Sequence, residues 1–159
     1  MKNLDIVSTV KVYSPNECDS ITNELIESAQ KATQRAYAPY SGYNVGAAVL
    51  LENGKIITGN NQENAAYPSG LCAERTALFY ANSQYPDSLV VAVAIVAFNK
   101  GCYTEDVCTP CGSCRQVFSE IEMRYNKPIR IIMCGRDKIY EVESISNLLP
   151  LSFGKDALE

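Results

Sequence analysis

Apolar residues recur along the chain with two spacings, and each spacing predicts a different element. Strands are expected where apolar residues alternate with polar ones or form a short continuous run. The run LVVAVAIVAF at 89–98 is typical of a strand covered on both faces. Asn53 and Gly54 predict a hairpin between two strands, because Asn-Gly supplies the positive φ of such a turn. The predicted strands span 44–51, 55–60, 89–98, 129–134 and 138–142.

Helical spacing of apolar residues fills the segments between the strands. The first helix is expected to start at Ser14, which can cap it, with Glu17 completing a capping box. Its buried stripe is expected to comprise Cys18, Ile21, Leu25, Ala29, Ala32 and Ala36. Further helices are predicted at about 71–83 and 111–125, with a short one near 144–149.

This alternation of strands and helices predicts one α/β domain. We expect three layers, α-β-α, around a mixed sheet of about five strands. Residues 14–159 would form this domain, and residues 1–13 an N-terminal extension. Within the extension, residues 4–12 alternate in the manner of a short extended or edge strand.

Composition narrows the classes of partner and compartment. Fourteen Lys and Arg stand against eighteen Asp and Glu, without a basic cluster, which disfavours nucleic acid and favours a small neutral ligand. There is no apolar run long enough to span a membrane and no secretory signal at the first residues. Seven cysteines, an odd number, then indicate reduced thiols in a cytoplasmic protein. Because histidine is absent, acid–base chemistry falls to other side chains.

Two short motifs predict a catalytic zinc site. They are Cys72-Ala73-Glu74-Arg75 and Pro110-Cys111-Gly112-Ser113-Cys114-Arg115. Tetrahedral zinc needs four ligands, and a catalytic site keeps one position for water. Three thiols, those of Cys72, Cys111 and Cys114, would leave that position open. Glu74 would lie beside it as the proton carrier, although an acidic residue is also common at a helix start.

The motifs also predict where the thiols lie. Ser69 can cap one helix and Pro110 can occupy the first position of another, so all three thiols would stand at helix N-termini. The helix dipole there favours the thiolate form that binds zinc. Arg75 and Arg115 would drain charge from the thiolates through hydrogen bonds to sulfur. The alternative for both arginines is an ordinary surface charge.

The remaining cysteines leave other interpretations open. Cys108 could close the tetrahedron as a fourth ligand, which would make a structural zinc module without activity. The spacing of Cys108, Cys111 and Cys114 also begins an iron–sulfur motif, but Phe118 is not the fourth cysteine that this motif requires. Cys18, Cys102 and Cys134 are expected to be buried or half-buried small apolar residues.

From about Tyr37 to Phe153, the chain resembles the small homotetrameric cytidine deaminases. The zinc deaminases are already known to combine this pattern of zinc ligands with a glutamate that does not bind the metal. The ligand pattern in this chain is therefore recognised by its similarity to theirs. The matching segments are Pro39-Tyr40-Ser41, Val45-Gly46-Ala47-Ala48, Gly59-Asn60-Asn61-Gln62-Glu63-Asn64-Ala65-Ala66-Tyr67-Pro68, Cys72-Ala73-Glu74-Arg75-Thr76-Ala77, Pro110-Cys111-Gly112-Ser113-Cys114-Arg115-Gln116-Val117 and Leu148-Leu149-Pro150-Leu151-Ser152-Phe153-Gly154.

The resemblance implies roles for further residues. Asn61 and Glu63 would hold the ribose 3′-hydroxyl, and Tyr43, where the family usually has Phe, would pack on the base. A neighbouring subunit would receive Phe153 in its pocket. The amide of Ala73 would help to orient the base. The same substrate loop contains Gln62, Asn64, Ala65, Ala66 and Tyr67.

The activity implied by the resemblance is hydrolytic deamination of cytidine and deoxycytidine, with one zinc per subunit and sites at the interfaces of a homotetramer. Zinc would activate a water molecule, and Glu74 would carry its proton to the ring nitrogen and the departing amine. A deaminase of another amino-heterocycle, such as an aminoacylnucleoside antibiotic, remains the alternative within the same chemistry.

Overall fold

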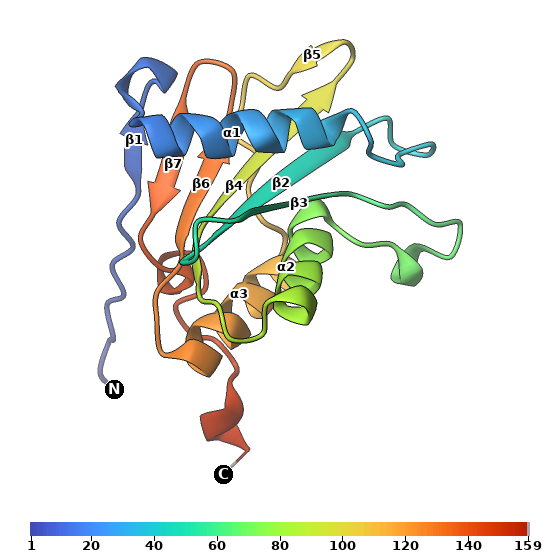
Figure 1. The fold of residues 1–159 in the computed structure, drawn as a ribbon. Helices are drawn as coiled ribbons and strands as arrows, with labels where there is room; N and C mark the ends of the chain where they lie inside the picture. Colours follow the sequence, from blue (N-terminus) through green and yellow to red (C-terminus); the bar gives the residue numbers. More distant parts are fainter. Residues whose placement is uncertain (159) are drawn as a thin grey trace.

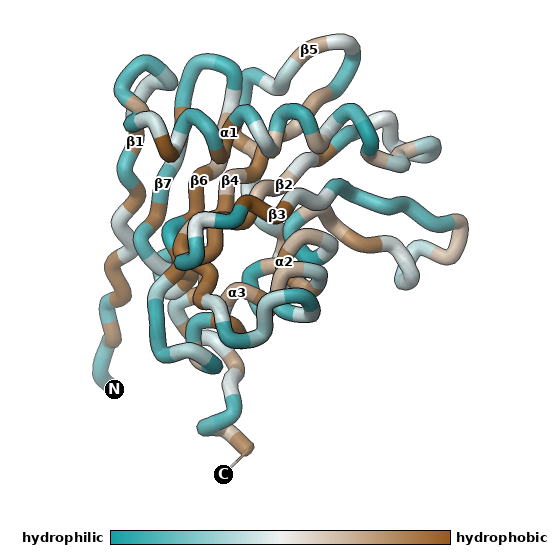
Figure 2. The backbone as a smooth tube through the Cα atoms, viewed as in Figure 1, coloured by the Kyte–Doolittle hydropathy of each residue, from teal (hydrophilic) through white to brown (hydrophobic). Residues whose placement is uncertain are grey.

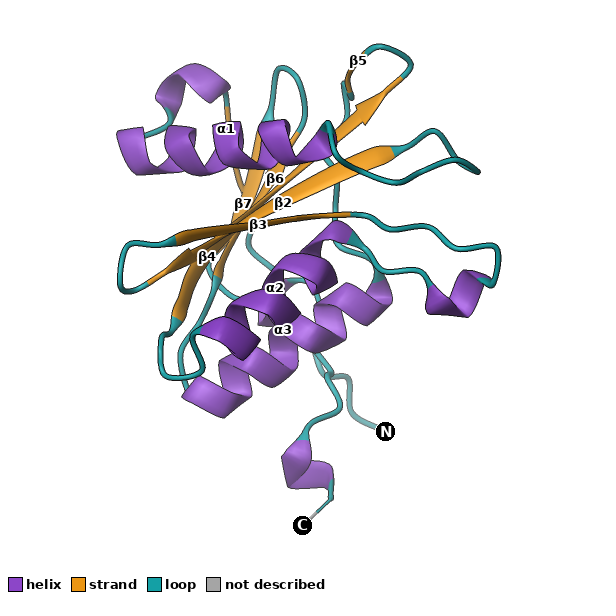
Figure 3. Ribbon diagram, turned by 45° about the vertical axis from the view of Figure 1, so that its right-hand side comes forward, coloured by secondary structure: helices purple, strands orange, loops and turns teal. Residues whose placement is uncertain are grey.

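The computed structural model of the chain describes residues 1–158, and these form a three-layer α-β-α domain (Figure 1). One mixed sheet lies between α1 on one face and α2 and α3 on the other (Figure 3). The helices are α1 (Ser20–Thr33), α2 (Ala73–Gln84) and α3 (Gly112–Tyr125). The strands are β1 (Lys11–Tyr13), β2 (Asn44–Leu51), β3 (Ile56–Asn60), β4 (Val90–Asn99), β5 (Cys102–Tyr103), β6 (Arg130–Cys134) and β7 (Ile139–Val142). The predicted fold class is confirmed.

The sheet has the strand order β1-β7-β6-β4-β2-β3, and β5 pairs with β4. Among the strands of residues 1–158, β4 and β6 alone pair in parallel, with α3 in the crossover between them. The other pairs, β2–β3, β2–β4, β4–β5, β6–β7 and β1–β7, are antiparallel. All five predicted strands are present. Over residues 1–158 the sheet has two strands besides these five. β1, with three residues, overlaps the edge strand expected at 4–12, whereas β5, with two residues, was not predicted.

Alternating residues of the central strands build two cores. On β4, Val93 and Ile95 pack toward α2 and α3, whereas Ala92 and Ala94 pack toward α1. This alternation is the two-residue period of a strand that is covered on both faces. The apolar strands accordingly form the brown centre of the molecule in Figure 2.

Two glycines bring the helices close to the sheet. A Cβ on Gly46 of β2 would lie 2.0 Å from the carbonyl oxygen of Ala29 in α1. A Cβ on Gly59 of β3 would lie 2.5 Å from the nitrogen of Ala77 in α2. Because real Cβ contacts are never this short, only glycine permits this spacing between helix and strand.

The first helix begins later than predicted. Ser14 and Glu17 do form the capping box, but it encloses a single 3₁₀ turn, η1 (Pro15–Glu17). Cys18 is extended, with ψ 140°, so the helix cannot continue through it. Asp19 instead caps α1 by accepting a hydrogen bond from the Thr22 amide at 2.7 Å.

Both ends of the chain leave the domain on the same side (Figures 1 and 3). Of the alternating segment 4–12, only the last two residues lie in a strand, β1 (Lys11–Tyr13), which forms the sheet edge beside β7. The Thr9 amide donates to Asn147 in η3 (Ile145–Asn147), the 3₁₀ turn found where a short helix was predicted. Among the described residues, none of the helices has both the length and the apolar character needed to cross a bilayer.

Candidate metal centre and substrate cavity

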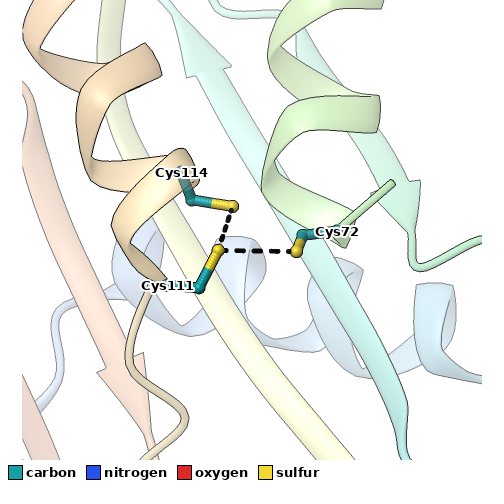
Figure 4. A group of neighbouring side chains, drawn as sticks. All are labelled: Cys72, Cys111 and Cys114. Carbon is teal, nitrogen blue, oxygen red and sulfur yellow. Dashed lines mark hydrogen bonds between the residues drawn. The ribbon is translucent and has the colours of Figure 1, made fainter. Parts of the chain in front are cut away.

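Three cysteine thiols meet where α2 and α3 begin. Cys72 is the N-cap residue of α2, Cys111 is the N-cap residue of α3, and Cys114 follows within the first turn. The Sγ atom of Cys111 lies 3.7 Å from that of Cys72 and 3.5 Å from that of Cys114. All three sulfurs lie within 4.8 Å of one another and point toward a common centre (Figure 4). The structure thus assembles the three predicted ligands.

The helices begin at different residues from those predicted. Ser69 does not cap α2, because it closes a separate 3₁₀ turn, η2 (Tyr67–Ser69). Leu71 then exchanges two backbone hydrogen bonds with Gln62, at 2.8 and 2.9 Å, which keeps this stretch extended up to Cys72. Pro110 likewise precedes α3 instead of opening it. Two of the cysteines therefore stand at the cap itself, next to first-turn amides that have no partner within the helix.

The donor set fits zinc. Hydrogen bonding with Cys114, together with the nearby Arg75 guanidinium, lowers the pKa of the Cys72 thiol to about 5. The same contact raises the pKa of Cys114, so the two thiols titrate as a pair. Three clustered sulfur donors suit a tetrahedral Zn²⁺ ion with one further position. Cys108 lies outside this group, so the structure gives no support to a four-sulfur site.

Glu74 lies beside the thiols with its side chain inside the protein. Only 4% of the residue is exposed, and it lines a cavity of about 620 Å³ together with Cys72 and Cys111. Burial raises the pKa of Glu74 to about 7, with a smaller contribution from the charge on Cys72. A carboxyl group with this pKa can both accept and release a proton at neutral pH.

The two arginines of the motifs have different partners. Arg75 lies 3.9 Å from the Cys72 sulfur through Nη2, and its Nε is buried without a hydrogen-bond partner among the described residues. Arg115 instead donates to the carbonyl oxygens of Pro110 at 2.9 Å and Leu148 at 2.8 Å. Within residues 1–158 no hydrogen bond joins Arg115 to a thiol, contrary to the expectation. Its guanidinium therefore connects the start of α3 with the C-terminal segment by hydrogen bonds.

Asn61 and Glu63 lie in the cavity wall and bind the segment that leads into β2 together with the start of that strand. Asn61 accepts from the Val45 amide at 2.8 Å and donates to the Tyr43 carbonyl at 2.8 Å. Glu63 accepts from the amides of Tyr40 and Ser41 and from the Ser41 hydroxyl. Each side chain keeps hydrogen-bonding capacity beyond these contacts, because an amide has two N–H groups and a carboxylate about four lone pairs.

The other predicted substrate residues divide into two groups. Gln62, Asn64, Tyr67 and Tyr43 line the cavity. The rest do not line it: Ala73 is fully buried in the core, Ala65 and Ala66 lie on the exposed loop, and Phe153 is 60% exposed, with its carbonyl bound by Gln116. Phe153 thus does not enter the cavity of its own chain.

Several cavity residues were not identified from the sequence. Ser41 is the most connected of them, since its hydroxyl binds Glu63 and also accepts from the Tyr43 amide at 3.0 Å. The motif Pro39-Tyr40-Ser41 signalled the segment without assigning it a role. The others are Tyr40, Val45, Gly70, Leu71, Cys108 and Thr109.

A comparison with protein families decides which kind of zinc protein this is. Residues 19–126 match the family described as the cytidine and deoxycytidylate deaminase zinc-binding region. The match covers more than half of the chain and contains all three clustered thiols and Glu74. The chain belongs to this family. The resemblance drawn from the sequence motifs is confirmed.

Relatives and solved structures agree with the family. The chain is 41% identical to the cytidine deaminase of Sporosarcina psychrophila over 85% of its own length and 93% of the relative's. It is 48% identical to that of Halalkalibacterium halodurans over 61% of its own length and 69% of the relative's. The cytidine deaminase structure from Burkholderia pseudomallei, 37% identical, superposes with a TM-score of 0.69 over 82% of this chain and 98% of that one. The structure from Mycobacterium tuberculosis, 33% identical, gives 0.66 over 86% and 99%.

The matched range of the family also shows which of the predicted site residues the family model covers. It begins just before α1 and ends just after α3, so it includes the thiols, Glu74, Asn61 and Glu63. The C-terminal segment with Phe153 lies beyond it.

Proposed function

We propose that this deaminase family member converts free cytidine and 2′-deoxycytidine, with water, to uridine or 2′-deoxyuridine and ammonia. The observation that carries the proposal is the position of Glu74, a buried carboxyl group that lines a cavity of about 620 Å³ beside three clustered thiols. The names of the similar proteins and structures support this choice of substrate.

Cys72, Cys111 and Cys114 would hold one Zn²⁺ ion per subunit. When bound, Zn²⁺ lowers the pKa of a coordinated water, which provides a nucleophile at neutral pH. Arg75 would withdraw charge from the Cys72 sulfur and so keep the ion a useful Lewis acid. Arg115 would support the site indirectly, because its hydrogen bond to the Pro110 carbonyl oxygen holds the backbone that precedes Cys111.

Glu74 would move the protons of the reaction. Its carboxylate takes a proton from the attacking water and delivers it to ring nitrogen 3 of the base, while the water oxygen bonds to carbon 4. A second proton then passes from the water oxygen through Glu74 to the exocyclic amine, the carbon–nitrogen bond breaks, and ammonia leaves. The raised pKa suits a group that must both accept and donate.

The cavity wall would fix the nucleoside. Glu63 and Asn61 have capacity left to accept from and donate to a ribose hydroxyl, and Tyr43 offers a flat face to the base. The amide of Ala73 would bind the 2-keto oxygen. The loop residues Gln62, Asn64, Ala65, Ala66 and Tyr67 would enclose the sugar.

We also propose a homotetramer with shared sites. Phe153 and Leu151 project from the C-terminal segment, 60% and 78% exposed, which leaves them free to enter a neighbouring subunit's cavity. An acidic chain with a net charge of −4 suits a free nucleoside better than nucleic acid. Its cysteines are all free, as suits the cytoplasm.

The experiment measures cytidine turnover by the fall in near-ultraviolet absorbance, with ammonia release as the second readout. Wild-type protein is expected to produce one ammonia per uridine. Glu74→Gln is expected to lower kcat by about 10²–10⁴-fold, because general acid–base catalysis typically contributes that much. Zinc content per chain should stay unchanged in this variant.

Glu120→Gln is the matched control, since Glu120 lies exposed on α3, away from the cavity. Its turnover should equal that of the wild type. Wild-type protein with zinc that deaminates an aminoacylnucleoside antibiotic but not cytidine would contradict the proposed substrate. Full activity of Glu74→Gln would contradict the proposed mechanism.

A further inference from the structure

The hydroxyl group of Ser41 lies between two polar groups of the cavity wall. It donates to Oε1 of Glu63 and accepts from the Tyr43 amide at 3.0 Å. Gly42, with a φ of 66°, makes the turn that brings the Tyr43 amide back to Ser41. Because a serine hydroxyl has a single hydrogen, and the amide of Tyr43 already donates to its oxygen, that hydrogen is directed toward Glu63. The hydroxyl is therefore oriented by the protein itself.

The two carboxylate oxygens of Glu63 have different partners. Oε2 accepts from the backbone amides of Tyr40 at 2.9 Å and Ser41 at 3.3 Å. Among the described residues, Oε1 accepts from the Ser41 hydroxyl alone. Each carboxylate oxygen has two lone pairs, so Oε1 can accept one more hydrogen bond, whereas Oε2 has both positions filled. Since Glu63 lines the cavity, Oε1 is the atom to which a sugar hydroxyl would donate.

The Ser41 hydroxyl provides the second point at which this carboxylate is held. The two amides hold one oxygen only, and the terminal torsion of a glutamate is broad, so the carboxylate could still turn about that oxygen. Packing does not prevent this rotation, because Glu63 is only half-buried. The hydrogen bond from Ser41 fixes the other oxygen and thereby the plane of the group. It is also the main cause that lowers the pKa of Glu63, which keeps the carboxylate ionised as an acceptor at neutral pH.

We propose that Ser41 is a positioning residue for the nucleoside sugar: its hydroxyl fixes Oε1 of Glu63 at the place where the sugar hydroxyl donates. The inference rests on the proposed function and deepens it. Ser41 acts through Glu63 and does not itself need to touch the substrate. The sugar is then recognised by a carboxylate whose orientation depends on a residue 22 positions earlier in the chain.

The sugar hydroxyl does not change during deamination, so its contact with Glu63 is equally strong in the ground state and in the transition state. Weakening this contact therefore raises KM and leaves kcat unchanged. The effect also depends on the ligand. A nucleoside without the 3′-hydroxyl does not make the contact, so loss of Ser41 cannot weaken its binding. A general disturbance of the cavity would weaken the binding of both nucleosides, and this difference separates a positioning role from a merely structural one.

The experiment measures KM and kcat for 2′-deoxycytidine, and the inhibition constant of 2′,3′-dideoxycytidine as a competitor in the same reaction. Ser41→Ala should raise KM about fivefold, the effect of losing one hydrogen bond, with kcat unchanged. The inhibition constant of the dideoxynucleoside should stay at the wild-type value. Ser41→Thr keeps the hydroxyl and should restore the low KM. Ser83→Ala is the matched control, because Ser83 is exposed at the end of α2 and does not line the cavity.

An unchanged KM in Ser41→Ala, an equal loss of affinity for both nucleosides, or a Ser41→Thr variant as impaired as Ser41→Ala would overturn the inference. A second measurement needs no substrate: the carboxyl carbon of Glu63 is titrated by NMR, with Glu63→Gln to assign its signal. Ser41→Ala should raise the pKa of Glu63 toward its ordinary value, because the ionised form loses a donor. If wild-type protein does not turn over cytidine, the proposed function fails. An unchanged pKa of Glu63 in Ser41→Ala would overturn the present inference in either case.

Discussion

Cys72 and Cys111 are 39 residues apart in the chain, yet their sulfurs lie 3.7 Å from each other. Each is the N-cap residue of its helix, and β4 runs between the two helices in sequence. The fold thus brings two helix starts together on one side of the sheet. An ion held there joins α2 to α3, so we expect it to contribute to stability as well as to catalysis.

Removal of zinc should destabilise the protein measurably. An ion that binds only the folded state adds about 2.7 kcal/mol when its free concentration is a hundred times its Kd. Chelation should therefore lower the melting temperature of wild-type protein. Cys114→Ser should melt at one temperature with and without chelator, whereas Cys102→Ser, outside the cluster, should respond as the wild type does. A chelator response that persists in Cys114→Ser contradicts the ligand assignment.

The two motif arginines should affect different properties. Arg75→Met removes the guanidinium that helps to lower the pKa of Cys72, so zinc affinity should fall by about tenfold or more. Arg115→Met removes two hydrogen bonds to carbonyl oxygens and should cost about 2 kcal/mol of unfolding free energy. Competition with a zinc chelator and urea unfolding measure the two effects. Loss of zinc affinity in Arg115→Met at unchanged stability would show that it acts on the metal after all.

The thiols outside the cluster should differ in their reactivity with pH. Alkylation requires the thiolate, and burial raises the pKa of both Cys108 and Cys134 to about 12. Both therefore stay protonated between pH 8 and pH 10, while Cys102 is exposed. We expect iodoacetamide to label Cys102 and to leave the other two unmodified across this range, as peptide mass spectrometry can show. Labelling of Cys108 as fast as Cys102 at pH 8 would contradict its burial.

Two glycine substitutions should have opposite outcomes. Gly59→Ala would place a Cβ 2.5 Å from the Ala77 nitrogen, so β3 and α2 must separate, at a cost of about 2 kcal/mol or more. Gly112 in the first turn of α3 has nothing within 4 Å of such a Cβ, and Gly112→Ala should leave stability unchanged or raise it by about 0.5 kcal/mol. Urea unfolding of both variants tests the close packing of α2. Equal stability of the two would contradict it.

Much of the fold could be predicted because long elements carry clear periodicity. The strand at 90–99 is continuous and apolar, and its two long ladder neighbours, β2 and β6, were recognised from the same kind of pattern. A two-residue strand such as β5 has no periodicity to detect. The helix starts predicted at Ser14, Ser69 and Pro110 were wrong, because a capping residue is recognised from the local sequence alone. The backbone pairing that keeps Leu71 extended comes instead from Gln62, in another part of the chain.

The metal ligands could be predicted because their spacing repeats a known chemistry. The roles of neighbouring side chains could not, since they depend on distant partners. Arg115 looked equivalent to Arg75 in sequence, but it faces the carbonyl of Leu148, 33 residues away. Cys102 was expected to be at least half-buried and is exposed, because it lies in the short β5 hairpin. Position in the fold, not residue type, decided these cases.

The central claim is an open zinc site with three sulfur ligands. X-ray absorption at the zinc edge of purified protein tests it most directly, because it counts ligands and measures their distances. We predict three sulfur atoms at about 2.3 Å and one oxygen at about 2.0 Å. Four sulfur atoms around the ion, or folded protein that binds no zinc at all, would contradict the claim.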